Sequence, residues 1–106
     1  MSVKLFVKTE GGTTWFEFNV LLHNREGSTF HVFAGKGYSR DDRDTVFLRN
    51  LLERFMRGDT GIEMISITPY TMVINHSRAI TGEDIQGWLS KVAKNLSKEV
   101  EVVGPG

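Results

Sequence analysis

The chain has 106 residues, of which 40% are hydrophobic and 25% are charged, which is the size and composition of one globular domain with its own core. Its 13 Lys and Arg residues balance its 13 Asp and Glu residues, so no bulk charge draws it to nucleic acid or to an acidic membrane. Cys is absent, which excludes disulfides, thiolate metal sites and Cys nucleophiles within these residues.

No stretch reaches the ~20 consecutive apolar residues that a membrane-spanning helix needs. The opening segment MSVKLFVKTE has only a short apolar run interrupted by lysines, so we do not expect a signal peptide. The lack of Cys fits a reducing compartment. We therefore expect a cytoplasmic protein that forms a single domain over residues 1–106 and has no membrane segment.

Alternating apolar residues predict strands over residues 3–8, 15–20 and 29–34. Gly11-Gly12-Thr13 marks the turn between the first two, and a polar break separates the second from the third. Because successive side chains of a strand point to opposite faces of a sheet, each strand has a core side and an outer side.

A helix is predicted from about residue 45 to residue 57. Asp41, Asp42 and Asp44 precede it, at a position where acidic groups oppose the helix dipole, and Gly58 is expected to end it. Its inner face consists of apolar residues spaced three and four apart, which are Phe47, Leu48, Leu51, Leu52 and Phe55.

The second half of the chain predicts a hairpin and a second helix. Residues 62–68 and 71–76 are apolar alternating runs on either side of a Pro-Tyr turn, and the segment Thr81-Gly82-Glu83-Asp84 is a capping box. The helix that follows has one apolar stripe, formed by Ile85, Trp88, Leu89, Val92, Ala93 and Leu96. Residues 99–103 form either a short edge strand or a tail.

This order, βββ-α-ββ-α with a possible final strand, predicts an α+β fold. We expect a two-layer sandwich in which a largely antiparallel sheet carries both helices on one face.

Catalytic and metal-binding motifs are weak in this sequence. The three histidines lie in separate segments and lack metal-ligand spacing, so we expect no metal site and no cofactor. The acidic stretch at residues 41–44 is better explained by helix capping than by a cation loop. Gly35-Lys36-Gly37 lacks the full phosphate-loop pattern, although Lys36, Tyr38 and Arg40 could touch an anionic partner. We expect no catalytic residues and a protein that is not an enzyme.

The outer side of the predicted sheet is the best candidate binding surface. If both helices cover one face, the opposite face carries Phe6, Trp15, Phe33 and Met64, one from each of four strands. Lys4 and Lys8 lie near them in the sequence. A contiguous apolar patch of this kind favours a protein partner or self-association. Single-stranded nucleic-acid binding is one alternative, and a small enzyme whose site forms between subunits is another.

Several segments resemble the N-terminal domain of the Nfu/NifU family. The segments Leu5-Phe6-Val7-Lys8-Thr9-Glu10, Trp15-Phe16-Glu17-Phe18 and Phe47-Leu48-Arg49-Asn50-Leu51-Leu52 are similar to its first strands and first helix. Ile62-Glu63-Met64-Ile65-Ser66-Ile67, followed by Pro69-Tyr70-Thr71-Met72-Val73-Ile74, is similar to its hairpin, and the final helix with its Trp also fits. The resemblance covers roughly residues 3–96.

In that family the cluster-carrying Cys-x-x-Cys lies in a separate C-terminal domain, and the N-terminal domain is an accessory that contacts other proteins. The resemblance therefore implies a non-enzymatic adaptor, accessory to iron–sulfur protein maturation, and it transfers no catalytic residue to this chain. The same function class, a protein-interaction domain, is the one that the outer sheet surface favours.

Overall fold

The computed structural model describes residues 2–36, 38–57, 60–77, 80–96 and 99–105. The elements in chain order are β1 (Ser2–Glu10), β2 (Thr13–Phe18), β3 (Phe30–Phe33), α1 (Val46–Phe55), β4 (Ile62–Ile67), β5 (Thr71–His76), α2 (Gly82–Leu96) and β6 (Glu99–Pro105).

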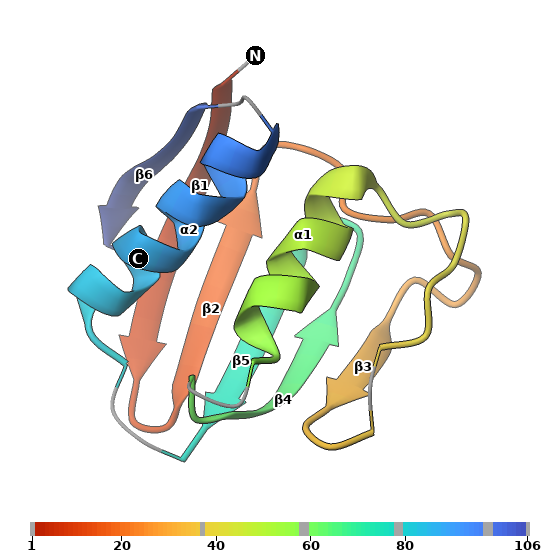
Figure 1. The fold of residues 1–106 in the computed structure, drawn as a ribbon, viewed down its shortest axis with the longest axis horizontal. Helices are drawn as coiled ribbons and strands as arrows, with labels where there is room; N and C mark the ends of the chain where they lie inside the picture. The colour runs from red at the N-terminus through yellow and green to blue at the C-terminus, as the bar shows by residue number, and fades with distance from the viewer. Residues whose placement is uncertain (1, 37, 58–59, 78–79, 97–98, 106) are drawn as a thin grey trace.

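The strands form one six-stranded sheet in the order β3-β4-β5-β2-β1-β6, and both helices lie over the same face of it (Figure 1). Every neighbouring pair is antiparallel except β1 and β6, which are parallel. The predicted α+β sandwich, with its largely antiparallel sheet and its helices on one face, is therefore confirmed. The sequence analysis allowed either a strand or a tail at the end of the chain, and the structure has the strand β6 there.

Local chemistry explains where the elements start and turn. Gly11, in the tight turn between β1 and β2, has a positive φ of 59°, which glycine adopts without steric cost. The predicted capping box begins α2, because the Thr81 hydroxyl accepts a hydrogen bond from the Asp84 N–H at 3.1 Å and the Asp84 carboxylate accepts one from the Thr81 N–H at 3.0 Å.

Helix α1 is shorter than the sequence predicted and is capped differently. Thr45 is its N-cap, and its hydroxyl accepts from the Leu48 N–H at 3.2 Å. The first turn contains no acidic residue, so the prediction that the aspartates at residues 41–44 serve this helix was wrong. The helix ends at Phe55 with Met56 as its C-cap, and the expected terminator, Gly58, lies outside the described residues.

The core lies between the sheet and the helices. It takes the inward side chains of β1 to β5 and the apolar stripes of both helices, and its largest fully buried members are Phe16, Phe55, Leu5, Leu22, Leu48, Leu51, Leu52, Ile65, Ile67, Met72, Ile74 and Leu89. Phe55 of α1 meets Trp88 of α2 with ring centroids 5.5 Å apart, so aromatic contact joins the two helices above the sheet.

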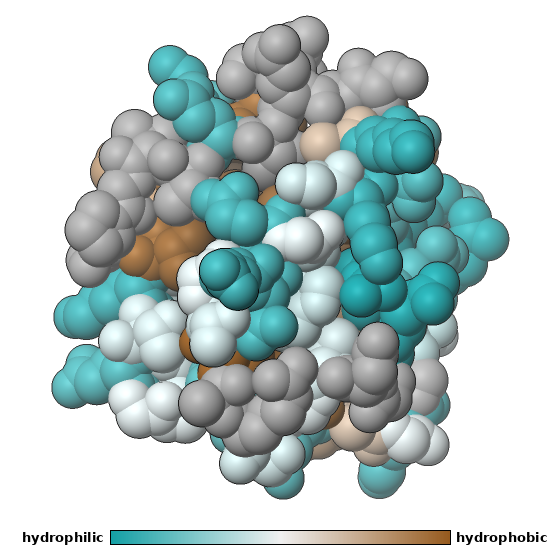
Figure 2. Space-filling model, turned by 60° about the vertical axis from the view of Figure 1, so that its left-hand side comes forward, coloured by the Kyte–Doolittle hydropathy of each residue, from teal (hydrophilic) through white to brown (hydrophobic). Residues whose placement is uncertain are grey.

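Figure 2 shows the surface with the β6 side of the molecule turned toward the viewer. Among the coloured residues, hydrophilic ones predominate and hydrophobic ones appear in small areas. Among the helices that the structure describes, none is long and apolar enough to cross a membrane.

We expect Trp88→Ala to lower the free energy of unfolding by about 3–5 kcal/mol, because the substitution leaves a cavity between α1, α2 and the sheet. Denaturant unfolding followed by circular dichroism measures this change. Ser90→Ala, at an exposed position of the same helix, is the matched control and should stay within about 0.5 kcal/mol of wild type. Equal stability of both variants would contradict the packing described for α2.

Candidate functional site

The face of the sheet opposite the helices, here called the open face, carries the residues that the sequence singled out. Phe6 of β1 is 52% exposed, Trp15 of β2 is 39% exposed and Phe33 of β3 is 46% exposed. Met64 of β4 is partly buried. The alternation of the strands therefore places the predicted residues as expected, with large apolar surface left in water.

The strand register groups these residues into two pairs. Phe33 lies directly opposite Met64 on the neighbouring strand. Trp15 is opposite Lys8, and Phe6 is opposite Glu17, so Phe6 and Trp15 are diagonal neighbours on β1 and β2. Both contribute to one hollow of about 280 Å³. Diagonal positions remain within reach of aromatic side chains.

Val73 of β5, which the sequence analysis did not single out, lies between the two pairs. It is opposite Trp15 on one side. On the other side it is opposite Ser66. Met64 lies two residues before Ser66 on β4 and is opposite Asn75, so Val73 is diagonal to Met64. These register positions define an apolar band across the open face, made of Phe33, Met64, Val73, Trp15 and Phe6. The alternation of residues 71–76 was the signal that could have identified Val73.

Charges of both signs border the apolar band. The Lys8 ammonium lies 5.9 Å from the centre of the Trp15 ring, at the distance of a cation–π contact. Glu17 shares the hollow beside Trp15 and also lines a second hollow of about 290 Å³ with Lys4 and Phe6. The band is thus an apolar surface with a mixed polar rim.

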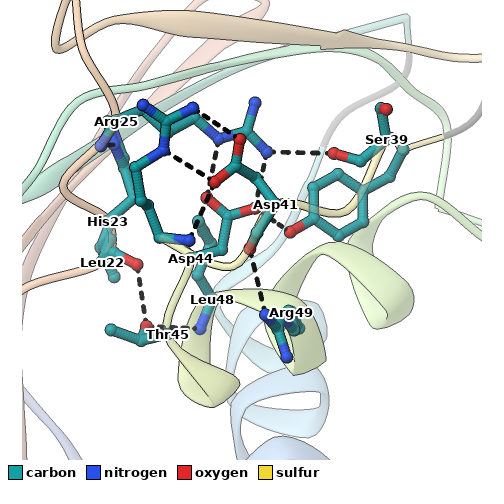
Figure 3. A network of polar contacts seen from close by, with 11 residues as sticks. Leu22, His23, Arg25, Ser39, Asp41, Asp44, Thr45, Leu48 and Arg49 are labelled. Atoms are coloured by element: carbon teal, nitrogen blue, oxygen red, sulfur yellow. Dashed lines mark hydrogen bonds and ion pairs between the residues drawn. The ribbon is translucent and has the colours of Figure 1, made fainter.

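A second cluster of functional groups lies where the loop after β2 meets the loop before α1 (Figure 3). The Asp44 side chain is fully buried, and Arg25 donates to both of its oxygens at 2.8 and 2.6 Å. The Tyr38 hydroxyl also donates to Asp44, and Arg25 reaches the Ser39 carbonyl at 3.0 Å. This buried network joins the loop after β2 to the loop before α1.

The protonation states in the buried network are firmly held. Burial alone would raise the pKa of Asp44, but hydrogen bonds from Arg25 and Tyr38 outweigh it and the net pKa shift is downward. Burial, together with the hydrogen bond to Asp44, raises the pKa of Tyr38 to about 12. These shifts favour an ionised Asp44 and a protonated Tyr38 near neutral pH, which are the forms that the hydrogen bonds from Arg25 and Tyr38 to Asp44 require.

His23 is fully buried next to this network and pairs with Asp44 in an isolated β-bridge. Its Nδ1 accepts a hydrogen bond from the Arg25 N–H at 3.1 Å, which places the proton of the neutral ring on Nε2. Burial lowers the pKa of His23, against the opposing effects of the Ile67 carbonyl and Asp44. The ring is therefore held neutral and contacts Phe30 edge to face.

The other two histidines are also bound within the fold. The His76 Nε2 lies 3.0 Å from the buried Thr14 hydroxyl, and the His31 Nδ1 lies 2.8 Å from the Ser66 hydroxyl on the open face. Across the residues that the structure describes, no group of three or more His, Asp and Glu side chains is placed to hold a metal ion.

No protein-family model matches this chain, and no curated protein or solved structure was found to be similar to it.

We expect Arg25→Met to destabilise the protein by about 3–5 kcal/mol, because the change leaves the buried Asp44 carboxylate without its charged partner. The Arg25 guanidinium also lies 3.7 Å from the centre of the Phe30 ring, so the loss includes this cation–π contact as well as the ion pair. Arg43→Met is the control, because it breaks the ion pair of Arg43 with Asp41, which is more exposed than that of Arg25 with Asp44. It should cost no more than about 1 kcal/mol. Similar losses in the two variants, measured by urea unfolding, would show that the buried network contributes no more than a surface pair.

Stability should also decline as the pH falls below about 6.5, because the pKa of His23 in the folded protein lies below its unfolded value of 6.5. The unfolded chain then binds the proton more readily than the folded one. Urea unfolding at several pH values between about 5 and 8 measures the slope. His23→Asn keeps an acceptor near the position of Nδ1 and should have a shallower slope, with His31 and His76 unchanged in both proteins. Identical slopes would contradict a buried neutral His23.

Proposed function

We propose that this chain is a non-enzymatic protein-interaction domain that acts through the apolar band of the open face. The observation that carries the proposal is the continuity of the band from Phe33 at one side of the sheet to Phe6 near the other. Monomeric proteins rarely leave large contiguous apolar patches in water, and aromatic residues are enriched in protein interfaces.

A second copy of the chain is the occupant that the charges favour. The formal net charge is +0 at pH 7, so two copies do not repel one another as a whole. The rim combines Lys4 and Lys8 with Glu17, so a copy of the same face can offer each charge an opposite partner. Aligned packing of two sheets face to face is a common way to bury such surfaces.

Single-stranded nucleic acid is a weaker candidate for the same face. Trp15 with Lys8 above it resembles a stacking platform beside a phosphate contact. Glu17, however, lies in the same hollow as Trp15 and would repel a phosphate backbone. Affinity for an oligonucleotide that falls steeply with salt would favour this alternative over self-association.

An accessory role in iron–sulfur protein maturation is a further proposal, which rests only on the resemblance of residues 3–96 to the Nfu/NifU N-terminal domain. A cytoplasmic setting belongs to the same proposal and is supported by the absence of Cys.

We expect Trp15→Lys to abolish association and leave the fold intact, because the substitution places a charge in the middle of the apolar band at an exposed position. Sedimentation velocity over a range of concentrations should show a dimer for wild type and a monomer for the variant. Val46→Lys is the matched control, since Val46 is 58% exposed at the start of α1, away from the open face. A wild-type protein that stays monomeric throughout, or a Trp15→Lys dimer, would argue against this surface.

A further inference from the structure

The surface between α1 and α2 contains a basic groove that association through the open face leaves unused. It has a volume of about 230 Å³ and is bordered by Glu53 and Arg54 of α1, by Arg57 just after that helix, and by Lys91 and Lys94 of α2, with Asn50 beside them. The two helices run in opposite directions over the sheet (Figure 1), and the residues of α2 that border the groove come from its second half. We call it the helix groove.

The described residues that border the helix groove carry an excess of positive charge. Four cations border it and Glu53 is its one carboxylate, an excess of three positive charges in a chain whose net charge is +0. In the part of the chain that the structure describes, the ion pairs are Arg25 with Asp44 and Arg43 with Asp41, and neither involves the groove. Like charges gathered in a partly enclosed surface repel one another, and a bound anion would relieve that repulsion.

Arg54 supplies the second, independent observation. Its Nε is buried and has no hydrogen-bond partner among the described residues, although a guanidinium N–H removed from water normally has one. The Phe55 carbonyl at the end of α1 accepts from another group, the Thr60 hydroxyl, at 2.7 Å. Arg54 is therefore a donor at the groove without an acceptor.

We propose that the helix groove binds a small oxyanion with two or more negative charges, of the phosphate-ester or polycarboxylate class. The planar guanidinium groups of Arg54 and Arg57 match the paired oxygens of both classes, and Lys91 and Lys94 add point charges from the opposite helix. The volume is below the roughly 300–1,000 Å³ typical of sites for drug-sized ligands, which suits a small anion.

The test is a titration of the purified protein with pyrophosphate and, separately, with citrate, followed by two-dimensional ¹H–¹⁵N NMR. Sodium chloride holds the ionic strength constant, so that diffuse screening does not change along the titration. We expect saturable shifts of the amide signals of residues 50–57 and 91–95 with at least one of the two probes. The probe that binds more tightly identifies the class of ligand.

Variants with equal charge changes test the location. Lys91→Gln with Lys94→Gln, at exposed positions, should weaken the binding of the preferred probe by at least about tenfold. Arg54→Gln should weaken it as well, with the wild-type pattern of amide signals as the check on its fold. Lys36→Gln with Arg40→Gln removes the same charge from the loop before α1 and should leave the affinity unchanged.

The proposal is overturned if neither probe gives saturable shifts in these segments, or if chloride alone produces the same shifts. It is also overturned if the two double variants lose affinity equally, which indicates a diffuse response to charge, or if only the Lys36 and Arg40 variant loses it. None of these outcomes depends on whether the open face associates, so the helix groove and the apolar band are tested separately.

Discussion

Coverage of a single face of the sheet is the constraint from which the main surfaces of this molecule follow. Both helices pack their apolar stripes on the same side, so the core forms there and the opposite side of β1 to β5 stays uncovered. The apolar band is a consequence of that arrangement, since period-two alternation must send some side chain outward at every second position. The helix groove is another, because two helices side by side on one face leave a furrow along their outer contact.

The buried network shows a different way in which the fold is held together. Asp44 is ionised and removed from water, which is unfavourable unless every oxygen is well paired. Arg25 and Tyr38 provide that pairing, and the Thr45 hydroxyl donates to the Leu22 carbonyl at 2.8 Å next to it. Two loops that lack regular secondary structure thereby become one rigid support for the start of α1. Asp44, which precedes the helix, pairs with side chains of the two loops, and Thr45 caps the helix.

Periodicity explains which parts of this structure were accessible from the sequence. Local patterns repeat every two or about 3.6 residues, so they identified the strands, the helices, their buried sides and the positions of Phe6, Trp15, Phe33 and Met64. Val73 was within the reach of the same alternation. The ion pair of Arg25 and Asp44 could not be predicted from such a pattern, because it joins residues 19 positions apart that lie in two irregular loops. The grouping of Arg54 with Lys91 likewise depends on how the helices pack, which no local pattern encodes.

The parallel pairing of β6 with β1 has a consequence for biosynthesis. β1 precedes the other strands of this sheet in the chain, and its pairing with β2 needs only a short turn, but β6, the strand on its other side, follows the other five. Until β6 is made, β1 presents an unpaired edge of backbone N–H and C=O groups, which is the type of edge that recruits foreign strands. A chain whose other strands pair before β6 docks on β1 is therefore open to intermolecular strand exchange along that edge.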